Sequence, residues 1–341
     1  MKSMYRRTLL AAAAVAFLSV NMHAQFVAVP NNILIADQFN NRVIEVNPVT
    51  HAVVFQFGNG SFTPGPSSVL APNDAERVGG FTLISGTGYP ANTPPCPKAA
   101  GCPDNRVFLV NDSTGQIVWQ YGQAGVTGSG PNQLNAPVCA VFLSSSVVPP
   151  SGGVLITDQG NQRIIEVSIA SKKIVFEYNQ GLNNPNSAEL LANGDILIAD
   201  ESNNRVIEIN SSKQIVQTLT AGGTLNGVAF ASRLPNGDTL ITDSNNNRIV
   251  QVDANDHIVF QYQTNTDPNS NPNPLPTRAV RLKSGNTLIA DQFNQRVIEI
   301  NSSGQVVFQQ GTENVSGNGP NQLFAPYDAK EINDYLGLTP P

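Results

Sequence analysis

Short apolar runs recur along the chain, and clusters of Asn, Gly and Ser separate them. The most regular unit reads LIAD, a polar turn and then RVIEI, with near-copies at 34–47, 155–167, 197–210, 240–253 and 288–301. A further apolar run, such as VVFQF at 53–57, follows after another polar turn. Runs of about five residues that are rich in β-branched and aromatic side chains and bounded by turn residues predict β-strands.

A sixth unit is split into two halves, 83–89 and 105–111, by a Cys-containing insertion at about 86–104. A Pro-x-x-Ala element precedes the LIAD run, as at 71–77 and 275–281, so each unit holds four predicted strands. Six four-stranded sheets that stack radially cover each other's apolar faces. We therefore predict an all-β, six-bladed β-propeller with antiparallel blades.

The spacing of equivalent Arg residues supports this count. Arg163 and Arg205 are 42 residues apart, and Arg205 and Arg248 are 43 apart. Propeller blades repeat at roughly 40 to 50 residues. After the sixth unit, residues 325–331 repeat the Pro-x-x-Ala element, so we expect this C-terminal strand to close the first blade. The N-terminal segment 26–30 competes for the same place.

Residues 1–24 have the layout of a secretory signal peptide. Lys2, Arg6 and Arg7 are followed by an apolar stretch at 9–20 and by Ala24 at the expected cut. No later segment reaches 18 consecutive apolar residues, which argues against membrane insertion. We expect a secreted or periplasmic protein with one propeller domain at 25–341.

The charge balance excludes nucleic acid as an expected partner. The chain has 19 basic and 25 acidic residues, a net charge of −6. Without residues 1–24, 16 basic residues remain and the net charge is −9. Nucleic-acid binding needs clustered Lys and Arg to neutralise phosphates.

The cysteines fit an exported protein. Cys96 and Cys102 lie six residues apart in a Pro- and Gly-rich stretch, so we predict a disulfide between them. A zinc site would need two more ligands, and only His51, His257 and Cys139 remain after residue 24. We interpret Cys139, which stands among Ala, Pro and Val, as a buried free thiol.

The repeat resembles the NHL family of β-propellers, whose units read Asp, two residues, Asn, one residue, Arg and an apolar strand. The matching Asp and Arg pairs are Asp37 and Arg42, Asp158 and Arg163, Asp200 and Arg205, Asp243 and Arg248, and Asp291 and Arg296. The second unit departs from the pattern, with Ser85 in place of the Asp. The resemblance covers nearly the whole chain after residue 24 and implies a propeller. The family includes RNA binders, interaction modules, lyases and hydrolases, so the resemblance does not fix a function.

We interpret the repeated Asp and Arg as structural. A carboxylate at a strand end fixes a tight turn by accepting backbone N–H groups, and an Arg can span to a neighbouring blade. The alternative is a functional ring of charges around a pore. Fivefold repetition favours the structural interpretation, because a catalytic site needs different residues at different places.

Chemistry is expected where the repeats differ. The position two residues after the Pro holds Asp74, Cys139, Ser187, Val228, Arg278 and Asp328. Asp74, Asp328 and Arg278 come together once the ring closes, and they are the candidate catalytic residues. The two carboxylates could hold a divalent ion (Ca²⁺ or Mg²⁺) or act as an acid/base pair. The alternative is an ion pair that lines the channel.

A second difference lies in the adjoining loops. Phe39 and Phe293 occupy equivalent places in the first and sixth units, flanked by Gln38 and Gln292. An aromatic ring beside amides suits a sugar ring or a peptide side chain. Polar neighbours are expected from Asn73, Asn186 and Tyr327. The alternative is that both rings cap apolar space between blades.

These observations favour an exported, monomeric and non-catalytic binding module for a glycan, a peptide or an envelope protein at the channel mouth, with no cofactor. The alternative is a divalent-metal-dependent hydrolase of the lactonase or esterase type, or a lyase, similar to lactonase-type propellers. No His lies near the innermost strands and no G-x-S-x-G motif is present, which argues against Ser-His-Asp chemistry.

Overall fold

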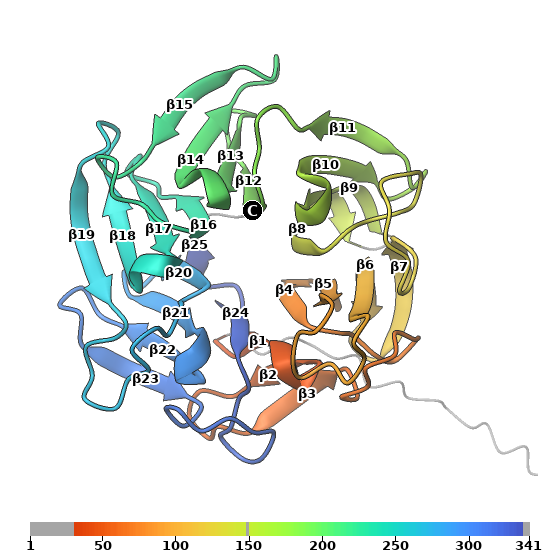
Figure 1. Cartoon of the computed structure of the whole chain (residues 1–341), viewed down its shortest axis with the longest axis horizontal. Coiled ribbons are helices and arrows are strands. Elements are labelled where there is room, and N and C mark those ends of the chain that lie inside the picture. The colour runs from red at the N-terminus through yellow and green to blue at the C-terminus, as the bar shows by residue number, and fades with distance from the viewer. Residues whose placement is uncertain (1–30, 148–149, 337–341) are drawn as a thin grey trace, which may run out of the picture.

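Six antiparallel sheets surround a central axis, and each forms a blade that runs from the axis to the rim (Figure 1). The computed structural model describes residues 31–147 and 150–336. Five of the sheets have four strands and one has five. The predicted six-bladed β-propeller is confirmed.

The blades are numbered 1 to 6 in chain order, and their strands are given from the axis outward. Blade 1 consists of β24 (Pro326–Glu331), β1 (Ile33–Asp37), β2 (Arg42–Val46) and β3 (Val53–Phe57). Blade 2 consists of β4 (Pro72–Val78), β5 (Phe81–Tyr89), β6 (Cys102–Asn111) and β7 (Gln116–Tyr121). Blade 3 consists of β8 (Pro137–Val147), β9 (Pro150–Asp158), β10 (Arg163–Ser168) and β11 (Ile174–Tyr178).

The other three blades follow the same plan. Blade 4 consists of β12 (Pro185–Leu190), β13 (Ile196–Asp200), β14 (Arg205–Ile209) and β15 (Ile215–Leu219). Blade 5 consists of β16 (Val228–Arg233), β17 (Thr239–Asp243), β18 (Arg248–Val252) and β19 (Ile258–Gln263). Blade 6 consists of β20 (Arg278–Leu282), β21 (Thr287–Asp291), β22 (Arg296–Ile300) and β23 (Val306–Gln310), with β25 (Tyr335–Leu336) beside β20.

The repeated Asp organises the turn between the second and third strands. In blade 1, Asp37 Oδ2 accepts hydrogen bonds from Asn40 Nδ2 and Arg42 Nε, both at 2.7 Å. Asp37 Oδ1 accepts the backbone N–H of Phe324 at 2.7 Å, in the loop that leads into β24. Blades 3, 4 and 5 repeat this pattern through Asp158, Asp200 and Asp243. One carboxylate therefore joins three segments of its own blade.

The residue before the repeated Arg links neighbouring blades, whereas the Arg of blade 4 stays within its own blade. The Arg205 guanidinium donates to the Gly181 carbonyl in the loop leading into its own blade, so the expected reach to the next blade is absent there. Instead Asn204, in the left-handed region at a φ of 53°, accepts the N–H of Gly227 at 2.8 Å, at the start of blade 5. Asn41 accepts the N–H of Ala71 in the same way.

Blade 2 keeps the carboxylate by a different route. Gly86 pairs with Arg106 as Asp37 pairs with Arg42, so the residue that replaces the Asp is Gly86 and not Ser85. The carboxylate comes from Asp104 on β6, which binds Arg106 and accepts the Leu70 N–H at 2.8 Å. A Cβ at Gly86 would lie 2.6 Å from Asp104 Oδ2, which explains the glycine. The insertion carries the predicted disulfide between Cys96 and Cys102.

The C-terminal segment closes the ring, as predicted. β24 pairs antiparallel with β1 from Ile33 to Asp37. After β24 the chain turns, and β25 pairs with β20 of blade 6, so this segment is bonded to both blades. The competing segment 26–30 lies outside the described residues.

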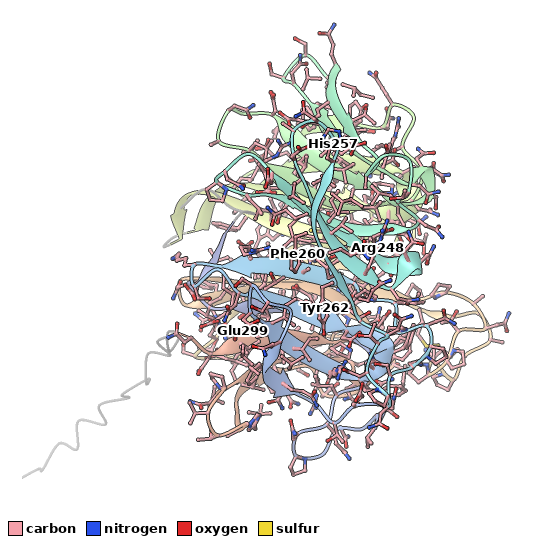
Figure 2. The ribbon with its side chains drawn as sticks, turned by 90° about the vertical axis from the view of Figure 1, so that its left-hand side faces the viewer. Arg248, His257, Phe260, Tyr262 and Glu299 are labelled. Atoms are coloured by element: carbon pink, nitrogen blue, oxygen red, sulfur yellow. A yellow bond between two sulfur atoms is a disulfide. The ribbon has the colours of Figure 1, made fainter. Side chains whose placement is uncertain are left out.

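Apolar side chains fill the spaces between blades. Figure 2 looks at the rim where blades 5 and 6 meet, with Phe260 and Tyr262 of β19 at this seam. Both rings pack against a buried cluster that includes Ile249 of blade 5 and Ile298 of blade 6. Each blade therefore depends on its neighbours for burial of its faces.

Asp291 in blade 6 lacks one of the bonds that its counterparts make. Its equivalents accept a backbone N–H two residues before the innermost-strand Pro, but that position in blade 6 is Pro274, which has no N–H. Within the described part of the chain, Asp291 Oδ1 is buried without a hydrogen-bond partner. Burial raises the pKa of Asp291 to about 6, against the lowering effect of Arg296.

Replacing Pro274 with Asn is expected to lower the pKa of Asp291, because the new N–H satisfies the orphaned oxygen. The folded-state pKa lies above the unfolded value of 3.8, so this group stabilises the fold at low pH, and that contribution is lost as the pH rises through about 6. At pH 7 the variant should gain about 1 kcal/mol, partly offset by the freer unfolded chain. Denaturant unfolding between pH 4 and 8 measures this.

Pro272→Asn is the matched control, because Pro272 is exposed in the same loop. A pH dependence of stability that is the same in Pro274→Asn, Pro272→Asn and wild type would contradict the assignment.

Candidate functional site

Four charged side chains meet at the propeller axis. Arg278 Nη2 lies 2.8 Å from Asp74 Oδ1, and Arg278 Nε lies 2.9 Å from Asp328 Oδ1. Lys330 Nζ lies 2.6 Å from both Asp74 Oδ1 and Asp328 Oδ2. All four side chains are at most 4% exposed. We call them the axial charge cluster; it contains the three predicted residues and also Lys330.

The place of Lys330 follows from the strand pattern of the sequence, although it is not among the predicted residues. Lys330 follows Asp328 by two residues on β24, and alternate residues of a strand share a face. Its side chain must therefore point to the axis with that of Asp328. Two cations and two carboxylates give the cluster no net charge.

Burial and pairing set the protonation of the cluster. Burial alone would raise the pKa of Asp74, but the charges of Lys330 and Arg278 lower it to about 2. Burial raises the pKa of Asp328 despite the same two cations. For Lys330, burial acts to lower the pKa, and the charges of Asp328 and Asp74 outweigh it and raise the pKa.

The carboxylates also satisfy backbone donors. Asp328 Oδ2 accepts the N–H of Ala75 at 3.0 Å, and Asp74 Oδ2 accepts that of Ala140 at 2.8 Å. These donors lie on the inner edge of the next blade's innermost strand, where no further strand can pair with them. The described residues contain no group of three His, Cys, Asp or Glu that could hold a metal ion.

One predicted axial position is wrong. Val228 pairs with Asp243, as Pro185 pairs with Asp200, so Val228 stands where the other innermost strands have Pro. Phe230 holds the axial position, with its ring centre 4.2 Å from the Arg278 guanidinium carbon. Blade 5 has no Pro at this point, which shifted the alignment by two residues.

A second set of polar side chains connects blades 1, 4 and 3 at the channel. Tyr327 of blade 1 donates from its hydroxyl to Asn186 Oδ1 of blade 4 at 3.2 Å. Asn186 Nδ2 donates to Glu201 Oε2 at 2.7 Å, and Gln159 Nε2 donates to the same oxygen at 3.2 Å. Burial raises the pKa of Glu201, and the Asn186 hydrogen bond lowers it.

Three predicted amides form a chain of hydrogen bonds. Gln292 Nε2 donates to Gln38 Oε1 at 2.9 Å, and Gln38 Nε2 donates to Asn73 Oδ1 at 2.7 Å. We call this the amide relay. It connects blades 6, 1 and 2, and it fixes the orientation of each amide along the way.

The predicted aromatic pair directly follows two residues of the amide relay, Gln38 and Gln292, in the chain. The Phe39 and Phe293 ring centres are 6.4 Å apart. Phe39 also packs against Tyr89 at 5.8 Å and edge-on against Phe324 at 5.2 Å. The ring of Phe39 is thus surrounded by other rings, an arrangement that favours the interpretation that it caps the space between blades.

A pocket of about 370 Å³ opens beside the amide relay, between blades 1, 2 and 3. We call it the mouth pocket. Its lining residues are Gln38, Asn73, Thr87, Gly88, Tyr89, Pro90, Ala91, Ala100, Pro103, Asn105, Thr127, Asn135, Ala136 and Gln159. None of them carries a charge. Among these residues, Gln38 and Asn73 are the two predicted from the sequence.

The missed part of the pocket has two sources. The Cys96–Cys102 insertion in blade 2 supplies one wall through Pro90, Ala91 and Ala100. In blade 3, Gly160 stands where blades 1 and 6 have Phe39 and Phe293. A Cβ at Gly160 would lie 2.5 Å from Asn135 Cγ, so a larger residue there would displace the Asn135 amide from its present position.

A model of the family described as outer membrane protein assembly factor BamB (PQQ_2) matches residues 103–322. The chain belongs to this family. The match covers more than half of this BamB-family chain, from blade 2 to the loop before β24. No curated protein matches the chain. The likeness of the repeats to the NHL family remains a prediction.

Solved structures share the fold of this BamB-family propeller. A protein of unknown function from Bacteroides caccae superposes with a TM-score of 0.60 at 15% identity, covering 89% of this chain and 100% of that one. A streptogramin B lyase structure gives 0.50 at 15% identity, covering 78% and 73%. The WD40 propeller domain of Doa1 gives 0.50 at 10% identity, covering 83% and 84%. At such low identities, these similarities show the fold alone.

Proposed function

We propose that this protein is an exported, non-catalytic binding module that holds an uncharged polar ligand in its mouth pocket. The observation that carries the proposal is the lining of that pocket, which combines amides and small apolar residues and has no charged side chain. A site of this composition suits a glycan, a peptide or a segment of an envelope protein, whose polar groups are neutral.

The state of the axial charge cluster supports a role without chemistry. Asp74 and Asp328 are each bound by Arg278, by Lys330 and by a backbone N–H of the next blade. To act in general acid/base catalysis or to bind a metal ion, these carboxylates would have to break their ion pairs and hydrogen bonds. The pairing also leaves neither cation free to hold an anionic substrate.

Three features support export. Residues 1–24 have the pattern of a signal peptide, and Cys96 and Cys102 form a disulfide of the kind that persists in oxidising compartments. The family is described by an outer membrane assembly factor. The described residues contain no helix that is both long and apolar enough to cross a bilayer. A periplasmic or secreted location fits these features.

The double variant Asn73→Leu with Asn135→Leu is expected to abolish ligand binding without unfolding the protein, because both amides line the pocket. Binding is screened on the protein after residue 24 with neutral oligosaccharides and capped neutral peptides, by thermal shift and by calorimetry. Asn183→Leu is the control, because Asn183 holds the position of Asn135 in blade 4, outside the pocket.

The same preparation tests the catalytic alternative. Turnover of simple lactones or esters that is lost in Asp74→Asn, or a stoichiometric divalent ion whose removal by EDTA lowers the Tm, would overturn the non-catalytic proposal. Binding that survives in the Asn73→Leu, Asn135→Leu double variant would overturn the placement of the site.

A further inference from the structure

We propose that the ligand of the mouth pocket is an extended, uncharged segment of polypeptide whose main-chain groups are bound by Asn73, Asn135 and Gln159. This inference rests on the proposed function and names the class of ligand. Two observations support it. The three side chains have hydrogen-bonding atoms without a partner among the described residues, and the pocket lining has no exposed aromatic face.

The amide relay turns Asn73 into a fixed donor. Asn73 Oδ1 accepts from Gln38 Nε2, which is itself held by Gln292. Asn73 Nδ2 has no hydrogen-bond partner among the described residues, and Asn73 is one of the residues that line the pocket. It therefore presents N–H groups, which match a peptide carbonyl oxygen.

Gln159 is held through its side-chain nitrogen, whereas Asn73 is held through its oxygen. Its Nε2 donates to Glu201 Oε2 at 3.2 Å, and Asn186 donates to the same carboxylate oxygen at 2.7 Å. One N–H of this amide is engaged, and Gln159 Oε1 has no hydrogen-bond partner among the described residues, so Oε1 can accept a peptide N–H. Glu201 acts here as a positioning residue, since it lies behind Gln159 and does not line the pocket.

Asn135 offers both kinds of group. Its backbone N–H is held by Asp158 at 2.8 Å, while its side-chain amide has no partner in the described part of the chain. The amide packs over Gly160, which has no side chain to displace it. One donor, one acceptor and one amide with both functions are the set needed to bind successive peptide units, in which C=O and N–H alternate.

The apolar part of the pocket argues against a sugar. Sugar rings are bound most favourably when an exposed aromatic face covers their C–H groups. Tyr89 is the one aromatic residue in the lining, but it is 3% exposed and its hydroxyl donates to Asn41 Oδ1 at 2.7 Å. The other apolar lining residues are Pro90, Ala91, Ala100, Pro103 and Ala136, which make a shallow surface suited to small side chains.

The pocket is also preorganised. The disulfide between Cys96 and Cys102 closes the insertion that carries Pro90, Ala91 and Ala100, and the buried Cys102 packs beside Tyr89. A wall held in this way loses little conformational freedom on binding. A weakly interacting neutral peptide can therefore bind without reordering the loop.

The test compares a peptide with a sugar of similar size on the protein after residue 24. The probes are acetyl-Ala-Ala-Ala-amide, the same tripeptide with methylated amide nitrogens, and N,N′-diacetylchitobiose, each titrated with detection by saturation-transfer NMR. The unmethylated tripeptide is expected to bind at least tenfold more tightly than either of the others. Asn73→Asp is expected to weaken tripeptide binding at least tenfold, because it removes the donor and keeps the acceptor for Gln38.

Asn183→Asp is the matched control, since it makes the same charge change outside the pocket and should bind as wild type. Pocket-dependent binding of the sugar, or equal binding of the methylated and unmethylated tripeptides, would overturn the peptide inference and leave the proposed function standing. No binding of any probe, or binding that Asn73→Asp does not change, would overturn both.

Discussion

A chain that ends at Gly319 is expected to lose cooperative unfolding altogether. The truncation removes β24, the innermost strand of blade 1, and exposes the edge of β1 from Ile33 to Asp37. It also removes Asp328 and Lys330, which leaves Asp74 and Arg278 buried at the axis without half of their partners. These losses together exceed the stability of about 5–15 kcal/mol that is typical of a folded domain.

The measurement is thermal unfolding followed by near-UV circular dichroism, in which the truncated chain should show no sigmoidal transition. A chain that ends at Asp334 is the matched control, because it lacks β25 but keeps β24. That control is expected to unfold cooperatively at a Tm a few degrees below wild type. A cooperative transition in the Gly319 truncation would show that another segment can fill the place of β24.

Replacing Lys330 with Met is expected to lower the free energy of unfolding by about 3–5 kcal/mol at pH 7. Met has a similar length, so the change removes a charge more than it opens a cavity. Asp74 and Asp328 then remain buried with Arg278 as their one shared cation, and breaking a buried ion pair from one side has costs of this size. Denaturant unfolding at pH 7 gives the value.

The pH dependence of stability shows whether the loss in Lys330→Met comes from the missing cation beside Asp74. In wild type the pKa of Asp74 is about 2, below the unfolded value of 3.8, so Asp74 stabilises the fold above pH 4 and this contribution is lost as the pH falls towards 2. In Lys330→Met the pKa of Asp74 should rise, and the loss on acidification should shrink. Adding Asp328→Asn should restore part of the stability, since it removes the unpaired charge. A Lys330→Met protein as stable as wild type would show that the cluster is not held by this cation.

The sequence predicted the six blades, the closing strand and the disulfide because each depends on a local pattern. Five nearly identical units fix the strands, and a further Pro-x-x-Ala element after the last unit fixes the closure. The errors arose where one blade departs from the pattern. In blade 2 the carboxylate comes from Asp104 on β6, whereas the other blades carry it at the end of the second strand. In blade 5 Val228 stands where the other innermost strands have the proline from which the predicted alignment was counted.

The axial charge cluster was largely predictable, and the mouth pocket was not. Asp74, Arg278 and Asp328 share one position in the repeat, so closing the ring is enough to bring them together. The pocket instead depends on the missing side chain at Gly160 and on an insertion without a repeat counterpart. Both features can be seen in the sequence, but the sequence alone does not show that they lie beside each other around one pocket.

The closing strand also sets the order of folding. The hydrogen bond from Phe324 to Asp37 spans 287 residues, so ring closure is a contact of very long range and should be the slow, late step of folding. Until it forms, β1 has a free edge that can pair with any extended strand. A synthetic peptide with the sequence of 325–331 should therefore slow refolding when added to the unfolded protein, and should have no effect on the closed ring.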